Sequence, residues 1–441
     1  MKLAANRPAV TIAVAVFFVA LVFAAYTQHA WEDYWITFRC SQNLATGHGL
    51  VYTPGERLHS FTSPLGVLLP AVFSWLTGNQ SEELALWLFR LASIAAFSAG
   101  MVLLFYVLQK LQQHRLATCL TLALLGLDAK LVDFTINGME TGLLFFFLAL
   151  AIHGLVVPGP RQMLRIGIGW AGLMWTRPDS CVYIAVLGIS ALIFSPNRTA
   201  GQSRKDLWKC FLVAGLVCTV LYLPWFLWAW SYYGSPVPHT IVAKGTNLPP
   251  VSLGEQLFNL LVFPGTLLTD VTSLNGVFTP AYTFFGGWPR SIILLCTCTA
   301  PGIVAILAWP FPQLRLPTRL FSLVFFLGNF YLTSVITYPF PWYYTTVAVF
   351  GYLTIGLLFD QALDLATRVR DWCRLLRGGL CVLALLLVAG QLFVTLCVAR
   401  QMRVQQQLIE NGLRRQIGLW LRSHARSPQD TVHIDVKGRG G

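Results

Sequence analysis

The sequence is poor in charged residues. Only 11% of its 441 residues are Asp, Glu, Lys or Arg, whereas 56% are apolar. Soluble domains carry about 25% charged residues, so this composition excludes an ordinary soluble enzyme, a disordered chain and a soluble nucleic-acid binder. The 31 Lys and Arg exceed the 18 Asp and Glu and give a net charge of +13. In a membrane chain, this excess is typical of loops that stay in the cytoplasm.

Several catalytic motifs are missing as well. The chain has no CxxC, no HExxH, no Walker-type phosphate loop, no GxGxxG followed by a ribose-binding acid and no GxSxG. These absences argue against zinc-protease, nucleotide-dependent and serine-nucleophile chemistry. Most of the 10 Cys lie in apolar runs, so we expect no disulfide framework. The His residues lack ligand spacing, so no metal site is predicted, although a divalent ion at Glu32 or Asp33 is left open.

Long apolar runs fill most of the chain. Because about 20 apolar residues cross a bilayer, we predict an all-α polytopic membrane protein with about eleven transmembrane helices. The two runs beside Arg177 are short and are expected to be half-depth or tilted. The run 64–76 is predicted to be a re-entrant or interfacial helix. The eleven predicted spans are 9–26, 84–108, 116–134, 139–157, 165–177, 180–195, 210–230, 291–309, 320–337, 342–359 and 378–399.

The distribution of Lys and Arg orients these spans. If the N-terminus is cytoplasmic, the short basic segments fall inside, and the long loops 27–83 and 231–290 fall outside. Residues 1–399 then form a membrane domain. Residues 400–441 are expected to be a short outer tail, apparently a truncated C-terminal domain, with a basic amphipathic helix on the membrane surface and one strand at 431–436.

The first outer loop holds the densest polar chemistry, in the segment WEDYWITFRCSQNLATGHGLVYTPGERLHSFTSPL at 31–65. We predict a helix from Asp33 to Thr46 that stops at Gly47. Arg39 is seven residues after Glu32 and can pair with it, which leaves Asp33 free. A carboxylate at this depth can deprotonate a hydroxyl group, and Arg can clamp a phosphate. Alternatively, the acid pair simply marks the end of a span.

This loop resembles the first outer loop of a bacterial family of polytopic GT-C glycosyltransferases, which includes the terminal arabinofuranosyltransferases of mycobacterial cell-wall assembly. Two features depart from the family pattern: His59-Ser60 replaces a usual Glu-Gly, and the outer C-terminal domain is nearly absent from this sequence. The resemblance is carried by Glu32-Asp33, Arg39, Asn43, Gly47, Gly49-Leu50-Val51, Pro54-Gly55-Glu56-Arg57 and Phe61-Thr62-Ser63-Pro64-Leu65, with weaker similarity in NGMETGL (137–143), TRPD (176–179) and YYGSPVPHTIVAKG (232–245).

The resemblance implies a GT-C fold in the bacterial inner membrane, with an active site on the periplasmic face. It further implies a polyprenyl-phosphate sugar donor, a glycan or glycolipid acceptor, and inverting transfer without a cofactor. Asp33 matches the position expected to act as the catalytic base. Cations are predicted to meet the leaving phosphate, and His side chains to meet sugar hydroxyls. The predicted substrate contacts are Glu32, Arg39, His48, Arg57, His59, Arg177 and Lys244.

Other interpretations remain open at this point. Arg177 either reaches the donor phosphate or forms a buried pair with Asp179 at a helix break. Glu140 fits a capping box with Asn137, and the aromatic residues 342–344 either stack on sugar or form an interfacial belt. For the whole chain, the alternatives are a transporter or flippase of a lipid-linked glycan, a surface-polysaccharide polymerase or ligase, and a non-catalytic family relative.

Overall fold

The regular secondary structure is entirely helical in the part of the chain that the computed structural model describes, which confirms the all-α prediction. The described residues are 7–195, 201, 203–246, 252–255, 257–258, 277–278, 301–334, 336, 340–368 and 373–424. The predicted strand at 431–436 and most of the second long loop lie outside them. The principal helices are α2 (Arg7–Thr27), α3 (Glu32–Ala45), α4 (Pro64–Leu76), α5 (Glu82–Leu111), α6 (Arg115–Gly126), α7 (Ala129–Ile136), α8 (Thr141–Val156), α9 (Gln162–Thr176), α10 (Ser180–Ile193), α11 (Arg204–Tyr233), α12 (His239–Thr246), α17 (Leu316–Ser334), η2 (Pro341–Tyr343), α18 (Tyr344–Arg368), α19 (Cys373–Val404), η3 (Gln405–Arg414) and α20 (Arg415–His424).

Five helical segments within these ranges are long and apolar enough to cross a membrane: α2, α5, α11, η2 with α18, and α19 through α20. A sixth arises if α7 and α8, which are bent by 117°, form one broken span. The chain is therefore a multi-pass membrane protein, but the predicted number of about eleven spans is not confirmed. The predicted span 116–134 is interrupted between α6 and α7, where Asp128 Oδ1 accepts a hydrogen bond from the Leu131 N–H at 2.8 Å and caps α7.

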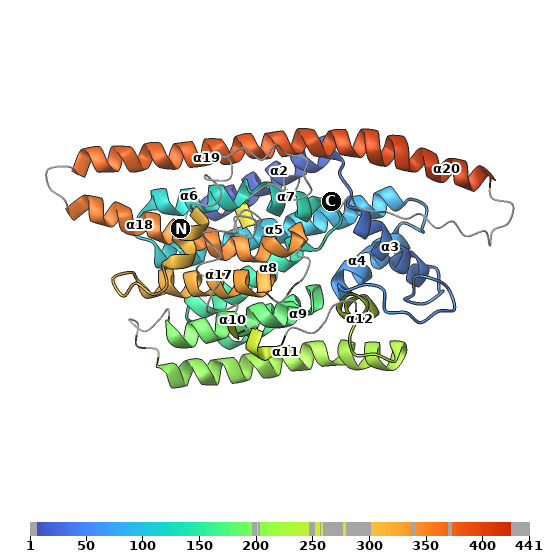
Figure 1. Cartoon of the computed structure of the whole chain (residues 1–441), viewed down its shortest axis with the longest axis horizontal. Helices are drawn as coiled ribbons and strands as arrows, with labels where there is room; N and C mark the ends of the chain where they lie inside the picture. The colour runs from blue at the N-terminus through green and yellow to red at the C-terminus, as the bar shows by residue number, and fades with distance from the viewer. Residues whose placement is uncertain are drawn as a thin grey trace.

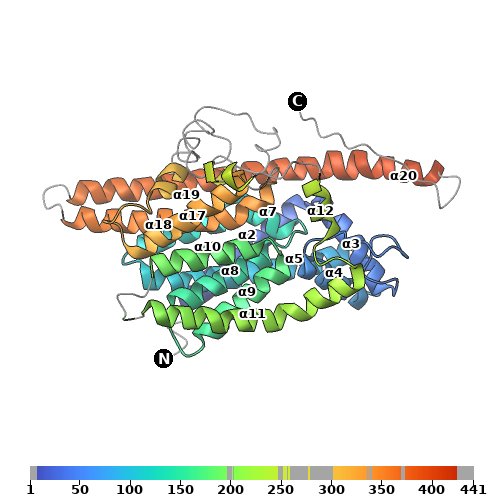
Figure 2. The same cartoon turned by 60° about the horizontal axis from the view of Figure 1, so that its bottom comes forward.

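The long helices lie side by side, with α11 along one side of the body and α19 along another (Figures 1 and 2). The helices α3 and α4, with the loop between them, project at one end of this bundle. Large apolar side chains of α11 and α19, such as Leu216 and Phe393, are exposed. Because lipid tails are as apolar as these side chains, the outward faces of both helices suit contact with a bilayer.

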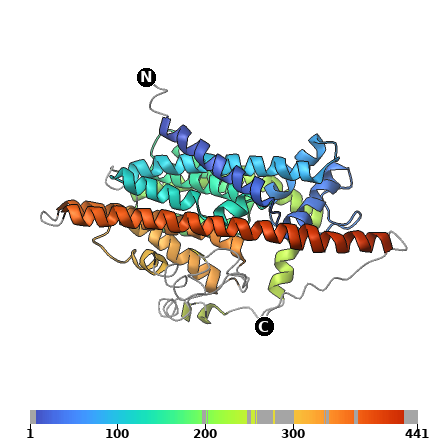
Figure 3. The same ribbon diagram turned by 90° about the horizontal axis from the view of Figure 1, so that it is seen from above.

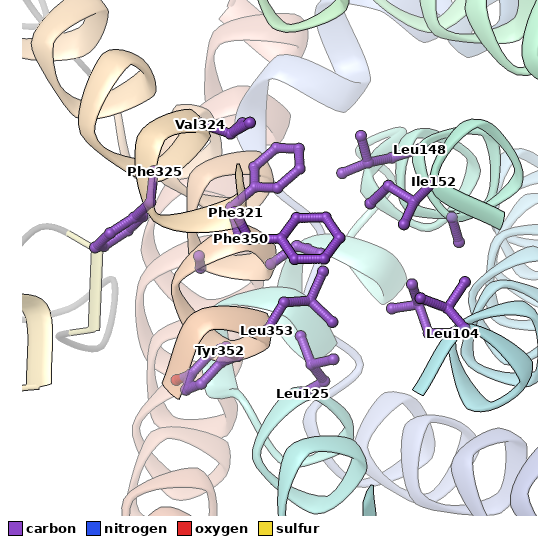
Figure 4. Close-up of a cluster of buried hydrophobic side chains, with 14 of the residues drawn as sticks. Leu104, Leu125, Leu148, Ile152, Phe321, Val324, Phe325, Phe350, Tyr352 and Leu353 are labelled. Carbon is purple, nitrogen blue, oxygen red and sulfur yellow. The ribbon is translucent and has the colours of Figure 1, made fainter. Parts of the chain in front are cut away.

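The centre of the bundle is packed with aromatic and aliphatic side chains. Figure 4 shows Phe321 of α17 and Phe350 of α18 facing Leu148 and Ile152 of α8. The two Phe rings stack with their centroids 6.3 Å apart. In hydrocarbon, such contacts stabilise through close packing rather than through removal of apolar surface from water. The shape of the packed side chains therefore determines how these helices are arranged.

Ion pairs and hydrogen bonds connect the helices at the end of the bundle away from α3. Arg315 donates to Asp360 at 2.6 Å, and its other terminal nitrogen donates to Asp364. The buried Asp360 also accepts from the backbone N–H groups of Gln113 and His114, at 3.0 and 2.9 Å. Two segments that we predicted on the cytoplasmic side therefore meet at one end of the bundle.

The C-terminal helix is one continuous rod, in which α19 passes through the π-helical segment η3 into α20. Figure 3 shows the rod running straight along the body and past its α3 end. Its 51 residues from Arg374 to His424 would extend roughly 70 Å or more, far beyond a hydrocarbon core of about 30 Å. Residues 400–424 thus continue α19, and their predicted position on the membrane surface stays a prediction.

Candidate active site

The acid pair stands at the first turn of α3. Trp31 is the N-cap residue, in extended conformation, and its N–H donates to the carbonyl oxygen of Asn137 at 2.8 Å. Glu32 is exposed and Asp33 is half-buried. Carboxylates in a first helical turn interact favourably with the helix dipole. The helix predicted at 33–46 is confirmed, with observed bounds Glu32–Ala45.

The loop after α3 is shaped by the residues of the sequence motif. Gly47 has a φ of 83°, a left-handed conformation that glycine adopts without strain, so the helix ends there as predicted. The Asn43 amide donates to the carbonyl oxygens of Val51 and Tyr52, at 2.8 and 3.0 Å. Arg39 Nε donates to the same Tyr52 carbonyl at 3.2 Å, and its guanidinium lies 4.9 Å from the centre of the Tyr52 ring. Both polar side chains therefore hold this loop.

The predicted ion pair between Arg39 and Glu32 is wrong. Glu32 Oε2 instead accepts a hydrogen bond from Arg414 Nη1 at 2.8 Å. Arg414 belongs to η3 and lies 382 residues further along the chain. Helical periodicity identified a shared face on α3, but it carries no information about a cation that the C-terminal rod brings to the same carboxylate.

The predicted capping box between Asn137 and Glu140 is also wrong. Glu140 is the N-cap residue of α8, and its side chain makes no cap hydrogen bond. The Asn137 amide oxygen accepts from the Met139 N–H, and its amide nitrogen donates to Asp133, each at 3.2 Å. The buried Glu140 carboxylate instead lies 3.9 Å from Arg177. Its role is therefore electrostatic rather than that of a helix cap.

The break between α9 and α10 holds Arg177, which is 8% exposed. Its guanidinium donates to both carboxylate oxygens of Asp179, each at 3.0 Å, which confirms the predicted pair. The same guanidinium lies 4.3 Å from the centre of the Tyr343 ring. A bidentate ion pair together with a cation–π contact holds the side chain in one orientation. Contact between Arg177 and a donor phosphate stays a prediction.

The FTSPL motif forms the start of α4. Ser63 Oγ accepts from the Gly66 N–H at 2.9 Å and caps the helix, and the predicted helix at 64–76 is observed with these bounds. A Cβ atom at Gly66 would lie 2.7 Å from Ser63 Oγ and 3.6 Å from Glu140 Oε2. A larger side chain there would therefore displace the capping serine and press on the Glu140 carboxylate. The motif thus ends against the Glu140–Arg177 pair.

Charged side chains from distant segments therefore gather near the start of α3, at one end of the bundle. The charge of Glu140 interacts most strongly with that of Arg177, then with that of Asp179, and most weakly with that of Asp33. We call Asp33, Glu140, Arg177 and Asp179 the ion cluster. It combines a half-buried carboxylate with a fixed, buried cation. Within the described residues, no group of three or more His, Cys, Asp or Glu side chains could hold a metal ion.

His59 is buried near this cluster. Its backbone N–H donates to Nδ1 of His239 at 3.1 Å, and its ring stacks on Tyr233 with centroids 4.4 Å apart. Burial, followed by the proximity of His239, lowers the pKa of His59 to about 4. The ring is therefore neutral near pH 7. A neutral imidazole can exchange hydrogen bonds with a sugar hydroxyl but adds no charge for a phosphate.

The remaining predicted substrate contacts are Arg57, His48 and Lys244. Arg57 is exposed, and its guanidinium lies 5.0 Å from the centre of the Tyr232 ring. The exposed His48 ring exchanges a hydrogen bond with Thr46 Oγ1 at 2.9 Å. Lys244 falls on α12, and its side chain lies outside the described part of the structure. Substrate contacts by all three residues stay predictions.

A mostly apolar cavity of about 180 Å³ adjoins the ion cluster. Pro64, at the start of α4, and Pro178, which follows Arg177, form part of its wall. His59 lines it from the first outer loop, and Trp225 of α11 and Ile241 of α12 line it from the opposite segments. Apolar walls beside a few polar groups suit a ligand with a hydrocarbon part and a polar head.

The sequence does not single out Glu140 as a substrate contact, and it leaves two roles open for Tyr343. Glu140 was assigned to a helix cap, although an ionisable residue beside a long apolar run is itself a signal of function. The aromatic sequence at 342–344 allows Tyr343 either to stack on a sugar or to belong to an interfacial aromatic belt, and it does not separate the two. The contact of Tyr343 with Arg177 depends on η2 lying against the α9–α10 break, which local sequence does not encode.

Comparison with known proteins supports the resemblance read from the first outer loop. The chain is 27% identical over 242 residues to a terminal beta-(1->2)-arabinofuranosyltransferase of Corynebacterium glutamicum, covering 49% of this chain and 33% of that protein. It is 27% identical over 250 residues to the protein of the same name from Mycobacterium tuberculosis, covering 51% and 37%. No protein-family model matches. The matches thus span only about a third of each relative, and within them the chain resembles terminal arabinofuranosyltransferases.

Proposed function

We propose that the chain is an inverting glycosyltransferase of the bacterial inner membrane. It moves a sugar from a polyprenyl-phosphate donor to a hydroxyl group of a cell-envelope glycan or glycolipid on the periplasmic face. The names of the two relatives suggest an arabinofuranosyl group as the sugar. The GT-C class, the donor and the inverting course belong to the proposal.

The observation that carries this proposal is the ion cluster. Asp33 stands at the start of α3, where the outer loop meets the bundle, and its charge interacts with that of Glu140. Glu140 in turn faces Arg177, which is held by Asp179 and Tyr343. A base and a fixed cation at one site are the two groups that direct displacement of a lipid phosphate requires.

The proposed reaction is a single displacement. Asp33 accepts the proton of the acceptor hydroxyl, and the hydroxyl oxygen forms a bond to the anomeric carbon of the donor. The bond between that carbon and the phosphate oxygen breaks with its electron pair, so the polyprenyl phosphate leaves as an anion. Arg177 stabilises the leaving charge, and attack from the opposite side inverts the anomeric centre.

The apolar cavity suggests where the lipid enters. It is bordered by Pro178, next to Arg177, so a phosphate near Arg177 would place the first part of its isoprenoid chain there. The exposed Arg39, His48 and Arg57 lie on α3 and the loop after it, where an acceptor arriving from the aqueous side would pass. The buried and neutral His59 is proposed to contact a sugar hydroxyl.

The proposal is tested by the variant Asp33→Asn, which keeps the side-chain shape but removes the base. With a defined polyprenyl-phosphate arabinose and a glycan acceptor in detergent, we expect turnover to fall by about 100-fold or more. The variant should retain its thermal unfolding midpoint, because Asp33 is half-buried at a helix start. Wild-type turnover by Asp33→Asn would contradict the proposed mechanism.

The same assay distinguishes the alternatives. A transporter or flippase would form no product in detergent, where no sealed membrane exists. A polymerase or ligase would accept a diphosphate-linked donor in preference to the monophosphate. Glu56→Gln provides a matched control, since Glu56 is an exposed carboxylate in the same outer loop and should leave turnover unchanged.

A further inference from the structure

The short link between α2 and α3 determines where the acid pair sits. It comprises residues 28–31 and contains Gln28, which has a left-handed φ of 51°. Only two residues separate Ala30 from Asp33, so a shift of the link moves the carboxylate directly. The groups that hold the link therefore control the geometry of the proposed reaction.

Carbonyl groups and the His29 side chain of this link bind to side chains of the helix bundle. Arg90 of α5, which is 2% exposed, donates to the carbonyl oxygens of Gln28 and His29 at 3.0 and 2.6 Å. The His29 ring is paired with Asp133 of α7 at 2.8 Å, and both side chains are buried. These contacts hold two carbonyl groups of the link and its one ionisable side chain.

A backbone N–H group of the link binds to the C-terminal rod. The Ala30 N–H donates to the side-chain oxygen of Gln406 at 3.0 Å, and Gln406 is 8% exposed. The Gln406 amide nitrogen donates to Asn411 Oδ1 at 3.3 Å, within the same π-helical segment. A buried backbone N–H needs an acceptor, and here that acceptor comes from a segment 376 residues away.

The rod makes a second contact just beyond the link. Arg414, at the last position of η3, binds Glu32 at 2.8 Å and Glu410 at 3.1 Å. Gln406 and Arg414 therefore hold the chain on either side of Trp31. A π-helix is rarely longer than a single turn and is frequently found at functional sites. Its position here coincides with the contacts to the acid pair.

We infer that η3 is a positioning element for the reaction, in which Gln406 and Arg414 hold the α2–α3 link and thereby fix the place of Asp33 within the ion cluster. This inference rests on the proposed function for its effect on turnover. Neither residue touches substrate; each acts through the backbone or the side chain next to the base. The C-terminal rod is thereby part of the active-site architecture.

The first test replaces Gln406 by Met, which keeps the length of the side chain but removes the acceptor. We expect kcat to fall roughly 10- to 100-fold, because a small misplacement of a reacting group has effects of this size. The KM for the donor should change little, since Arg177 and the cavity are untouched. Gln406→Glu, which keeps an acceptor oxygen, should recover most of kcat. Gln407→Met is the matched control, on the exposed side of the same turn.

The second test is independent of activity. Hydrogen–deuterium exchange of the peptide covering residues 27–35 should be about five- to tenfold faster in Gln406→Met than in Gln407→Met, because one backbone hydrogen bond is lost. For the ion pair, Arg414→Met should lower kcat and Arg414→Lys should restore it, with Arg415→Met as the control.

The outcomes separate the two proposals. If wild-type enzyme transfers sugar and Asp33→Asn does not, but Gln406→Met behaves like Gln407→Met in both kcat and exchange, the positioning role is refuted and the proposed function stands. If the wild-type protein forms no product, the proposed function fails, while faster exchange in Gln406→Met still supports the role of Gln406 in holding the α2–α3 link. A loss of thermal stability with an unchanged kcat for the folded protein would show a purely structural contact and would also refute positioning.

Discussion

Arg177 shows how one buried cation is held by several partners. Its guanidinium is bound by both oxygens of Asp179, lies 3.9 Å from Glu140 and rests on the ring of Tyr343. These contacts offset the cost of burying a charge, which is large for an unpaired ion. The residue types could be read from the sequence. The approach of Glu140 and Tyr343 to this arginine could not, because the three residues come from separate segments.

At the scale of a single residue, the variant Arg177→Lys tests these contacts. Lysine keeps the charge but loses the fork that binds two oxygens at once. We expect the protein to fold and kcat/KM for the polyprenyl-phosphate donor to fall about 10- to 100-fold, corresponding to the loss of one or two charge-assisted hydrogen bonds. Steady-state kinetics with varied donor concentration measures this change.

Arg165→Lys is the control for this variant, because Arg165 lies on the same helix α9 at its other end, where it contacts His153 and Val157. Equal losses in both variants would assign the effect to folding rather than to the site. Arg177→Met is less informative, since leaving the buried Glu140 and the half-buried Asp179 without a cation is expected to cost about 3–5 kcal/mol of stability.

At the scale of helices, small residues determine how closely neighbours approach. Gly142, in the first turn of α8, packs against α5, where an added Cβ would lie 2.3 Å from the Ser93 carbonyl oxygen and 2.5 Å from its Oγ. Close approach through small residues is the usual way in which helices associate in lipid. The turn that carries Glu140 is therefore held in place by the α5–α8 contact.

We predict that Gly142→Ala is destabilising, by roughly 1–3 kcal/mol, because the methyl group must push two backbones apart. Thermal unfolding in detergent should show a lower midpoint. Gly188→Ala on α10 is the matched control, since a Cβ there would meet its nearest neighbour, Phe211, at 3.9 Å. An unchanged midpoint in Gly142→Ala would mean that the two helices are not in close contact.

The helices themselves were largely predictable, because apolar length and capping chemistry act locally. The helix at 64–76, predicted to be re-entrant or interfacial, has the predicted bounds, and α3 ends at Gly47 as expected. The span predicted at 116–134 was not continuous, since Asp128 caps a new helix inside the apolar run. The unbroken rod from α19 into α20 was also not foreseen, because a polar segment on a helix looks the same as the start of a separate tail.

For the whole molecule, the positive-inside rule and the structure agree about which segments share an end. The ion cluster and the loop after α3 lie at one end, while Arg315, Asp360 and the 113–114 segment meet at the other. The rod crosses from the second end to the first (Figure 3). The polarity of the bundle therefore places the proposed chemistry on a single face of the membrane.

We predict that this face is the periplasmic one. In a variant without native cysteines, Glu56→Cys should react with a membrane-impermeant maleimide in intact spheroplasts. Pro158→Cys, exposed at the end of α8 away from the ion cluster, should react only after permeabilisation. Labelling of both sites after permeabilisation confirms that each thiol is accessible. The reverse pattern in intact spheroplasts would place Asp33 in the cytosol and overturn the proposed donor and acceptor.

The amino-acid sequence alone determined the membrane class, most helix positions and the resemblance carried by the first outer loop, and it predicts the orientation of the loops. These properties follow from local composition, helix-ending residues and the placement of charge relative to apolar runs. The tertiary structure decided which charges meet: Glu140 with Arg177 rather than with its own helix end, and Glu32 with Arg414 rather than with Arg39. Such pairings depend on how helices pack, so a contact between residues 382 positions apart leaves no periodic signal in the chain.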